Sequence, residues 1–397
     1  MIFRTRRRRA GVGQPSTNVA VLILGRSGAL SGGDLHALRL AEAWSRRPGA
    51  SVSLIGDPGL REFVNEPLLK HVDVTTPFDS RMANNSLWLT IGLLWRGLST
   101  VPKLRHSQHV LASSHLIFDV APAAAAHWLF GSKVSSFVYH IIGDMGRPRS
   151  ARSLGAKWLE ALSLWLLNHT HSVRFADNPE AKAGLVARGH PITKLFDTGN
   201  AYDPGIDVPA HDPASPPRLV FIGRLVEQKG IMDVLEVARR LQASAPDWQI
   251  DIVGDGPERR NLVAPIQRSG LDNVQLHGFV DDATKWHVLS QATLFLAPSR
   301  EEGWGIAVGE ALLASVPVVA LDLPAYRHFP LPLQFALGPG EAFADRVMEL
   351  VGDDDLIADL TSEIADGRSL LPSWAEVVTG DLAILDPSVR QPLSSNP

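Results

Sequence analysis

The 397-residue chain contains no cysteine. This absence excludes a disulfide framework, a catalytic thiolate and any zinc site built on cysteine, and it suits a reducing compartment. No apolar run approaches the roughly 18 residues that a membrane-spanning helix needs. The basic N-terminus MIFRTRRRRAG also lacks the apolar segment of a secretory signal. We therefore expect a cytoplasmic protein that does not perform redox chemistry.

Several motifs of known chemistry are missing as well. The segment GRSGALSGG at 25–33 does not have the GxGxxG spacing of dinucleotide-binding folds. The sequence offers no convincing Ser-His-Asp arrangement and no second carboxylate pair for acid–base catalysis. The acidic run at 353–355 is interpreted as a solvated loop, so no metal is expected. No HExxH pair occurs among the 14 histidines, and four of them are scattered singly: His115, His127, His169 and His171.

Charge is unevenly distributed, although the formal net charge is only -4. Residues 1–205 contain 24 Lys and Arg against 14 Asp and Glu, whereas residues 206–397 contain 14 against 28. Opposite charges favour attraction between the two halves across a cleft, and a basic half also suits an anionic acceptor or an anionic membrane surface. The five arginines at 4–9 fit these interpretations or a solubilising arm. A nucleic acid partner is not expected.

The segment at 203–217 contains five prolines and no periodic apolar pattern, which is typical of a linker. On each side of it an apolar strand, a glycine-containing turn, an amphipathic helix and a second strand follow in the same order, which predicts two doubly wound α/β domains with parallel sheets. The predicted strands and helices lie at 18–24, 34–44 and 51–56 before the linker, and at 218–223, 232–242 and 248–254 after it. The predicted organisation is a basic flexible arm at 1–17, a first domain at 18–202, the linker at 203–217, a second domain at 218–375, and a C-terminal helix and tail at 376–397.

Two carboxylates flank a glycine-rich turn in EEGWGIAVGE at 301–310. The preceding LFLAP is a predicted strand and IAVGEALLA a predicted helix, so the turn leaves the carboxyl end of a strand, where open parallel sheets bind ligands. Gly303 and Gly305 allow close approach of the backbone to a ligand, and the helix start favours phosphate. Glu302 and Glu310 can accept hydrogen bonds from sugar or ribose hydroxyls. Solvated or capping glutamates are the alternative interpretation.

Two cations follow another predicted strand, in RLVFIGRLVEQKG at 218–230. Arg224 and Lys229 stand five residues apart between Gly223 and Gly230. Cations at a strand end suit a pyrophosphate, whose departing charge must be stabilised when a glycosidic bond breaks. Seen singly, each is more often an ordinary surface charge.

Four segments of the second half, GRLVEQKG, VGDGPER, LHGFV and PSREEGWGIAVGEALLASVPVVA, together resemble the nucleotide-sugar domain of glycosyltransferase family 4. In the first half SGGDLHALRLAEAW, SSHLIFDVAP, FVYHIIGD and DTGNAYDP are similar to the family, and SWAEV precedes a terminal helix. The resemblance implies the GT-B architecture: two Rossmann-like domains facing across a cleft, with a C-terminal helix that crosses back to the first domain.

The resemblance also implies a role for each matching residue. Glu310 would bind the ribose hydroxyls and Glu302 the donor sugar, while Arg224 and Lys229 would bind the diphosphate. The backbone from Gly278 to Val280 would line the base pocket. Gly32 and Gly33 would let the first loop approach phosphate and acceptor, and His140 would lie near the donor sugar, with Asp144 as a further candidate. A histidine at a strand end is otherwise a satisfied structural residue.

The implied activity is that of a retaining hexosyltransferase in glycan biosynthesis, which uses a nucleoside diphosphate sugar and no further cofactor. A leaving phosphate oxygen accepts the proton of the acceptor hydroxyl in the usual account of the family. The acceptor is a glycan, a lipid-linked sugar or a secondary metabolite. A GT-B sugar-nucleotide epimerase, a phosphorylase and a donor-binding subunit without turnover stay open as alternatives. This sequence departs from the family pattern at two places. Ser315 stands where glycine is usual, and the segment at 321–333 replaces the usual acidic turn.

The segment at 87–105 mixes Trp88 and Trp95 with Arg96, Lys103 and Arg105. Such a mixture is compatible with a membrane interface. Packing of an ordinary helix against the first sheet is the simpler interpretation.

Overall fold

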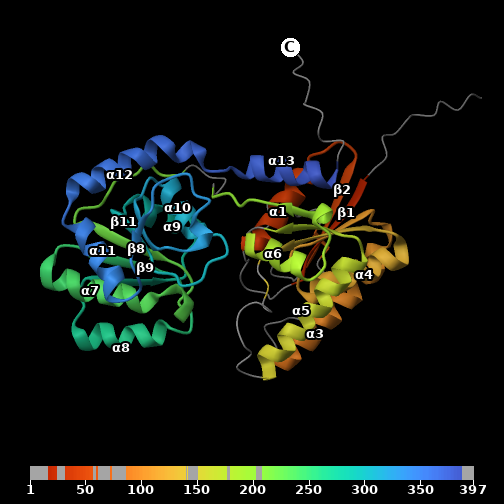
Figure 1. Ribbon diagram of the computed structural model, residues 1–397, viewed down its shortest axis with the longest axis horizontal. Coiled ribbons are helices and arrows are strands. Elements are labelled where there is room, and N and C mark those ends of the chain that lie inside the picture. The colour runs from red at the N-terminus through yellow and green to blue at the C-terminus, as the bar shows by residue number, and fades with distance from the viewer. Residues whose placement is uncertain are drawn as a thin grey trace, which may run out of the picture. The chain divides into compact units, whose positions relative to one another are not determined.

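The computed structural model describes residues 17–24, 32–56, 60, 72–73, 86–139, 141, 151–176, 179–202 and 208–386. These residues divide into two compact units. One runs to Thr198 and resumes at Val378, and the other runs from Gly199 to Val377. Each unit contains a parallel sheet with helices packed against it (Figure 1). The predicted basic arm lies almost entirely outside the described residues, and the predicted domain limits stay predictions.

The sheet of the first unit has, within the described residues, seven parallel strands in the order β3-β2-β1-β4-β5-β6-β7. The strands are β1 (Thr17–Ile23), β2 (Ala50–Gly56), β3 (Val72–Asp73), β4 (His109–Ala112), β5 (Lys133–Val138), β6 (Val173–Ala176) and β7 (Leu195–Asp197). The helices are α1 (Gly32–Ser45), α3 (Ser86–Thr100), α4 (Ile117–Phe130), α5 (Ala151–His169), α6 (Pro179–Ala187) and α13 (Trp374–Leu385), with the short 3-10 helices η3 (Val101–His106) and η5 (Ile192–Lys194).

Side chains of this first sheet alternate between two apolar layers, as the geometry of a strand requires. Ala20, Leu22 and Val138 belong to a buried cluster that includes residues of α4, α5 and α6. Phe137 points to the opposite face, where its ring lies 4.4 Å from that of His36 on α1. Because both faces are covered, most residues of β1, β4, β5 and β6 are buried.

The C-terminal helix α13 packs against the first unit, as predicted. The Asp381 carboxylate accepts a hydrogen bond from the Thr198 hydroxyl at 2.8 Å and lies 2.7 Å from Nε2 of His36. The side chains of His36 and Asp381 are 0% and 3% exposed. The end of the chain is thus joined to α1, near its beginning.

The sheet of the second unit has, among the described residues, six parallel strands in the order β10-β9-β8-β11-β12-β13. The strands are β8 (Arg218–Ile222), β9 (Gln249–Val253), β10 (Val274–Gly278), β11 (Leu294–Ala297), β12 (Val318–Leu321) and β13 (Gln334–Ala336). The helices are α7 (Ile231–Ser244), α8 (Arg259–Ser269), α9 (Asp282–Ser290), α10 (Ile306–Leu313), α11 (Glu341–Val351) and α12 (Asp354–Gly367), with the short 3-10 helices η6 (Glu227–Lys229), η7 (Pro324–Tyr326) and η8 (Arg368–Leu370).

The second sheet also separates two apolar layers. Leu219 and Phe221 face a cluster formed with α7, α8, α11 and α12. Val220 between them faces a cluster that contains Tyr202, Tyr326 and residues of α9 and α10. The prediction of two doubly wound parallel α/β domains is confirmed, because apolar periodicity is a strong signal for strands and helices of this length. None of the described helices combines the length and the apolar character needed to cross a bilayer.

Candidate functional site

The candidate site of the second unit lies where its strand order reverses. β8 and β11 are paired neighbours, with β9 and β10 on one side and β12 and β13 on the other. Open parallel sheets bind ligands outside the carboxyl ends of their strands at such a reversal. The loops that leave these two strands are residues 223–230 and 298–305. They carry both predicted cations and Glu302.

Backbone contacts hold these two loops together. The N–H of Arg300 donates to the carbonyl of Gln228 at 2.8 Å. Gly230 has a φ of 67°, and a Cβ atom there would lie 2.0 Å from the carbonyl oxygen of Pro298. Glycine is required because the left-handed backbone and the close approach leave no place for a side chain. The Arg300 guanidinium also contacts the buried Asp233 of α7 at 3.1 Å.

Lys229 and Glu302 form an ion pair across the two loops. Nζ of Lys229 donates to Oε1 of Glu302 at 2.5 Å, and the Ser299 hydroxyl donates to the same oxygen at 2.8 Å. The side chains are 27% and 14% exposed, so water and ligands can reach them. Oε2 of Glu302 has no hydrogen-bond partner among the described residues. The pair therefore presents a positioned cation beside a carboxylate oxygen that can accept a further hydrogen bond.

Arg224 is exposed and follows the carboxyl end of β8. Within the described part of the chain its guanidinium has no hydrogen bond or ion pair. The backbone beside it is fixed, because the N–H of Leu225 donates to the carbonyl of Asp255 at 3.0 Å. The structure thus combines a positioned backbone with a cationic side chain that can bind an anion.

Glu310 of α10 forms a second ion pair, with Lys285 of α9. Nζ donates to Oε1 at 2.7 Å, and the side chains are 17% (Lys285) and 13% (Glu310) exposed. Burial raises the pKa of Glu310, and the charge and hydrogen bond of Lys285 oppose that rise. Burial alone would lower the pKa of Lys285, but Glu310 and Asp282 outweigh it, so this pKa is raised. Lys285 was not predicted, because nothing in the local sequence of α9 links it to a carboxylate 25 residues away.

Gly303 and Gly305 differ in why glycine is needed. Gly305 precedes α10 with a φ of 77°, and a Cβ atom there would lie 2.7 Å from the ring of Tyr326. A Cβ atom on Gly303 would meet nothing within 4 Å. The positive φ and the packing on Tyr326 therefore explain why residue 305 is a glycine. The space beside Gly303 is free for a ligand.

An aromatic cluster supports the loop before α10. The ring of Trp304 stacks on His328 with centroids 4.0 Å apart, and Nε2 of His328 lies 2.8 Å from the Tyr202 hydroxyl. Burial lowers the pKa of His328 to about 4. His328 and Tyr326 belong to the segment at 321–333 that departs from the family pattern. The structure assigns that segment to packing beneath the loop, a role that the sequence alone did not reveal.

The predicted base-pocket segment follows β10. Gly278 has a φ of 71°, and its carbonyl accepts a hydrogen bond from the N–H of Gly254 at 2.8 Å. Phe279 is 82% exposed, whereas Val280 packs against the apolar cluster on the α9 and α10 side. Gly278 and Val280 thus belong to the same end of the sheet as Lys229 and Glu302.

The candidates of the first unit are only partly described. Gly32 and Gly33 are the first residues of α1, and not part of the preceding loop as the sequence suggested. A Cβ atom on Gly33 would lie 2.1 Å from the ring of Tyr139, whose hydroxyl donates to the carbonyl of Gly33 at 3.0 Å. Packing against Tyr139 is therefore sufficient to explain why residue 33 is a glycine. His140 and Asp144 lie outside the described residues.

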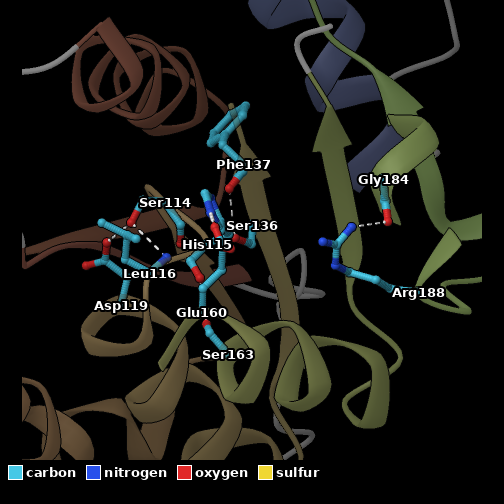
Figure 2. A network of polar contacts seen from close by, with 10 residues as sticks. All are labelled: Ser114, His115, Leu116, Asp119, Ser136, Phe137, Glu160, Ser163, Gly184 and Arg188. Atoms are coloured by element: carbon cyan, nitrogen blue, oxygen red, sulfur yellow. Dashed lines mark hydrogen bonds and ion pairs between the residues drawn. The ribbon is translucent and has the colours of Figure 1, made fainter. Parts of the chain in front are cut away.

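A buried polar network follows β4 in the first unit (Figure 2). Nε2 of His115 lies 3.0 Å from Oε1 of Glu160, and both side chains are 3% exposed. Asp119 accepts hydrogen bonds from the N–H of Leu24 at 2.9 Å and from the Ser114 hydroxyl at 2.5 Å. Burial raises the pKa of Asp119 to about 7 against these hydrogen bonds. His115 is thus paired inside the protein, and the sequence did not link it to Glu160.

Comparison with known proteins identifies the second unit. Residues 209–365 match the family described as glycosyl transferases group 1. This segment of the chain belongs to the family. The matched residues contain both ion pairs of the candidate site and none of the first unit. Among the described residues no group of three or more His, Asp or Glu side chains could hold a metal ion.

The relatives that match this chain have different acceptors in their names. The 2-deoxystreptamine N-acetyl-D-glucosaminyltransferase of Niallia circulans is 29% identical over 147 residues, which cover 36% of this chain and 38% of that protein. The phosphatidyl-myo-inositol mannosyltransferase of Mycobacterium leprae is 33% identical over 145 residues, 35% of this chain and 38% of that protein. The chain therefore spans less than half the length of these relatives.

Solved structures extend the comparison beyond the second unit. The HepE protein of Anabaena, crystallised with UDP and glucose, matches 94% of this chain and 100% of its own with a TM-score of 0.70. The sequence identity is 18%, so this likeness concerns the fold, which is GT-B.

Proposed function

We propose that this protein is a retaining hexosyltransferase that moves a sugar from a nucleoside diphosphate sugar to a hydroxyl group of an acceptor. The observation that carries this proposal is the Lys229–Glu302 ion pair at the reversal of the second sheet, with Glu310 on the helix that follows. A cation and two carboxylates at one sheet edge suit a ligand with a diphosphate and several hydroxyl groups.

The proposed contacts follow from charge and position. Lys229 and Arg224 bind the diphosphate, and the free oxygen of Glu302 accepts a hydrogen bond from the donor sugar. Glu310 binds the ribose hydroxyls, which requires its ionised form, and Lys285 favours that form. The space beside Gly303 admits the ligand, Gly305 starts the helix whose free N–H groups face phosphate, and Gly278 with Val280 borders the base.

The proposed reaction needs no strong base. The acceptor oxygen forms a bond with the anomeric carbon as the bond from that carbon to the diphosphate oxygen breaks, and the hydroxyl proton passes to the leaving phosphate oxygen. Lys229 and Arg224 stabilise the negative charge of the leaving diphosphate. Glu302 stabilises the positive charge that develops near the anomeric carbon. No metal is part of this proposal.

The first unit is proposed to bind the acceptor. Gly32, Gly33 and His140 are the proposed contacts there, and the acceptor is a glycan, a lipid-linked sugar or a small metabolite. The two relatives have different acceptors in their names, which supports this breadth. Each matches the chain over little more than a third of its length, so neither acceptor is assigned to this protein. We further propose that the protein acts in the cytoplasm.

Calorimetric titration with UDP, GDP and ADP tests the donor site. One diphosphate should bind clearly more tightly than the others, because the base pocket has one shape. Replacing Lys229 or Glu310 by alanine should weaken that binding by about 1–3 kcal/mol, the usual cost of removing a hydrogen-bond partner. Unchanged affinity in both variants would contradict the assigned site. Glu302→Gln should reduce sugar transfer far more than nucleotide binding.

Lys285 offers a sharper test, because it contacts two carboxylates of different exposure. Lys285→Met should weaken nucleotide binding, since Glu310 would lose the charge that favours its ionised form. Asp282 lies 3.1 Å from Lys285 but is 77% exposed. Asp282→Asn should therefore leave the affinity unchanged. Equal effects of the two variants would show that Lys285 does not act through Glu310.

Product analysis with and without acceptors addresses the other activities of this fold. Transfer with retained anomeric configuration supports the proposal. Conversion of the sugar nucleotide alone would indicate an epimerase, and dependence on phosphate would indicate a phosphorylase. Nucleotide binding without any product would indicate a subunit that binds the donor and does not catalyse transfer.

A further inference from the structure

The outer side of α3 is apolar although it faces solvent. Trp88, Ile91, Trp95 and Leu98 are 62%, 46%, 63% and 52% exposed. Their spacing of three, four and three residues puts them along one side of the helix. The opposite side packs on α4, where a Cβ atom on Gly97 would lie 2.6 Å from the carbonyl oxygen of Phe118. The sequence predicted packing of this helix against the first sheet, whereas its main contacts among the described residues are with α4 and η3. Trp88 and Trp95 are more than half exposed beside that contact.

The helix α5, which also packs on α4, repeats this arrangement. Leu154, Trp158, Leu162 and Trp165 are 49%, 71%, 48% and 51% exposed, at a spacing of four, four and three residues. α4 contacts both α3 and α5, and the three helices lie together in Figure 1. The end of α4 adds exposed Trp128, Leu129 and Phe130. We call these eleven residues the aromatic face.

The aromatic face is far from typical of a soluble surface. It contains five of the ten tryptophans of the chain. Single exposed apolar residues need no explanation, but eleven large ones on three packed helices are typical of an interaction site. Tryptophan is enriched where an apolar phase meets water, because its ring is apolar and its indole N–H is polar.

The exposed charges on the described residues of α3, α4, α5 and η3 have one sign. α3, α4 and α5 contain only two carboxylates, Asp119 and Glu160, and both are buried, at 1% and 3% exposure. Lys157 on α5 and Lys103 in η3 are partly exposed, and Arg105 in η3 is exposed. A surface of apolar side chains with cations and without exposed carboxylates is complementary to a layer of anionic headgroups.

Other parts of this chain offer little to cover the aromatic face. The segments before α3 and α5 that lie outside the described residues include REFVNEPLLKH at 61–71, VTTPFDSRMANN at 74–85 and IGDMGRPRS at 142–150. The last eleven residues are PSVRQPLSSNP. Each contains only two to four large or branched apolar residues, too few to match eleven exposed ones.

We propose that the aromatic face binds the surface of an anionic lipid bilayer, with its tryptophans at the level of the headgroups. Lys103, Arg105 and Lys157 then face lipid phosphates. A second copy of the chain is a poorer occupant, because a symmetric dimer would bring the same patch of each copy together. Its cations would meet cations, and no exposed carboxylate on these helices would compensate them. This proposal is independent of the proposed transferase activity.

Flotation of the full chain with vesicles tests the proposal. The protein should float with vesicles of phosphatidylglycerol and phosphatidylcholine and remain behind with phosphatidylcholine alone. Replacing Trp88, Trp95, Trp158 and Trp165 by serine should reduce the partition coefficient at least about tenfold, since binding scales with the apolar area inserted. Equal binding by this variant, or equal binding to both kinds of vesicle, would overturn the proposal.

Matched control variants distinguish binding through the aromatic face from nonspecific hydrophobic binding to vesicles. Leu337 and Leu370 are 104% and 65% exposed in the second unit, so a Leu337→Ser, Leu370→Ser variant loses exposed apolar surface elsewhere. It should float like the parent. Charge reversal at Lys103, Arg105 and Lys157 should lower binding about tenfold or more and make the remainder insensitive to salt. Far-UV circular dichroism and urea unfolding establish that every variant is folded.

Two further measurements distinguish a lipid bilayer from a second copy of the chain as the partner of the aromatic face. Lipids brominated near the headgroup should quench the tryptophan fluorescence of the parent and not that of the serine variant. Sedimentation equilibrium without lipid should find the parent monomeric. A dimer that the tryptophan substitutions dissociate, together with absent flotation, would assign the face to a second copy and overturn the proposal.

Discussion

Ser315 has a φ of 63°, in the left-handed region that side chains with a Cβ atom avoid. It follows the end of α10, and its N–H donates to the carbonyl of Leu312 at 3.0 Å. Helices commonly end with glycine at such a position, because glycine meets no steric penalty there. The departure from the family pattern at this residue therefore concerns backbone strain, and no donor contact depends on it.

We predict that Ser315→Gly raises the free energy of unfolding by about 0.5–1 kcal/mol. Relief of about 1–2 kcal/mol of left-handed strain should exceed the added chain entropy of glycine in the unfolded state. Urea denaturation measures the difference. Ser269→Gly is the matched control, since Ser269 is the last residue of α8 and has no positive φ. It should lower stability, and a loss in both variants would show that Ser315 is not strained.

Asp119 makes the stability of the protein depend on pH. Its pKa is about 7 in the folded protein and 3.8 in an unfolded reference, so the native state binds the proton more tightly. Stability from this residue is complete below pH 4 and decreases as the pH rises towards and through 7. We predict that its contribution falls by about 2–3 kcal/mol between pH 5 and pH 8.

Asp119→Asn measures this contribution, because the amide resembles the neutral acid in shape and keeps an acceptor for the N–H of Leu24. Urea unfolding at both pH values should show a smaller loss of stability for the variant than for the parent. Burial lowers the pKa of His109 and His190 to about 4, and these histidines change stability in the opposite direction. They are present in both proteins and cancel in the comparison. An identical pH dependence would contradict the raised pKa of Asp119.

At the scale of the element, the helix α10 illustrates how packing overrides helix propensity. A Cβ atom on Gly309 would lie 2.1 Å from the ring of Tyr202, a buried residue of the same unit. Gly380 in α13 is also helical, but a Cβ atom there would meet nothing within 4 Å. The two glycines thus have the same backbone and different surroundings.

We predict that Gly309→Ala lowers the free energy of unfolding by about 1–3 kcal/mol, the usual cost of overpacking. Gly380→Ala should raise it by up to about 1 kcal/mol, because alanine is the better helix former. Both variants are compared by thermal and urea unfolding. Stabilisation by Gly309→Ala would mean that Tyr202 moves aside without cost.

The elements themselves follow from local sequence, whereas the contacts between them do not. Apolar runs such as 18–24 and 218–223 predicted strands, because a run of that length matches a buried strand. The segment 87–105 predicted a helix but not its exposed side, since apolar residues occur all around its first part and the periodicity has no preferred face. Only the packing on α4 decided that Trp88 and Trp95 face solvent.

At the scale of the whole molecule, the buried contact of Asp381 joins the last helix to α1. Replacing Asp381 by alanine should lower the free energy of unfolding by about 3–5 kcal/mol, because His36 and Thr198 would lose a buried partner. Asp386 lies near the end of the same segment and pairs with Arg47 at 2.8 Å, but its side chain is 29% exposed.

Asp386→Ala is therefore the control and should cost no more than about 1 kcal/mol. Calorimetric unfolding of both variants makes the comparison. Similar losses would show that burial does not distinguish the two contacts. Nucleotide affinity should be unchanged in both variants, because neither residue belongs to the second unit.

The sequence by itself determined the two parallel α/β domains, the glycosyl transferases group 1 segment, the loops that carry Lys229 and Glu302, and the helix that carries Glu310. Each of these signals is local, because a strand, a turn or a motif is read within about 25 residues. Tertiary structure alone decided that Lys229 bonds to Glu302, that Lys285 bonds to Glu310, and that one side of α3 and α5 remains exposed. Their partners are distant in sequence, and only the folded chain brings them together.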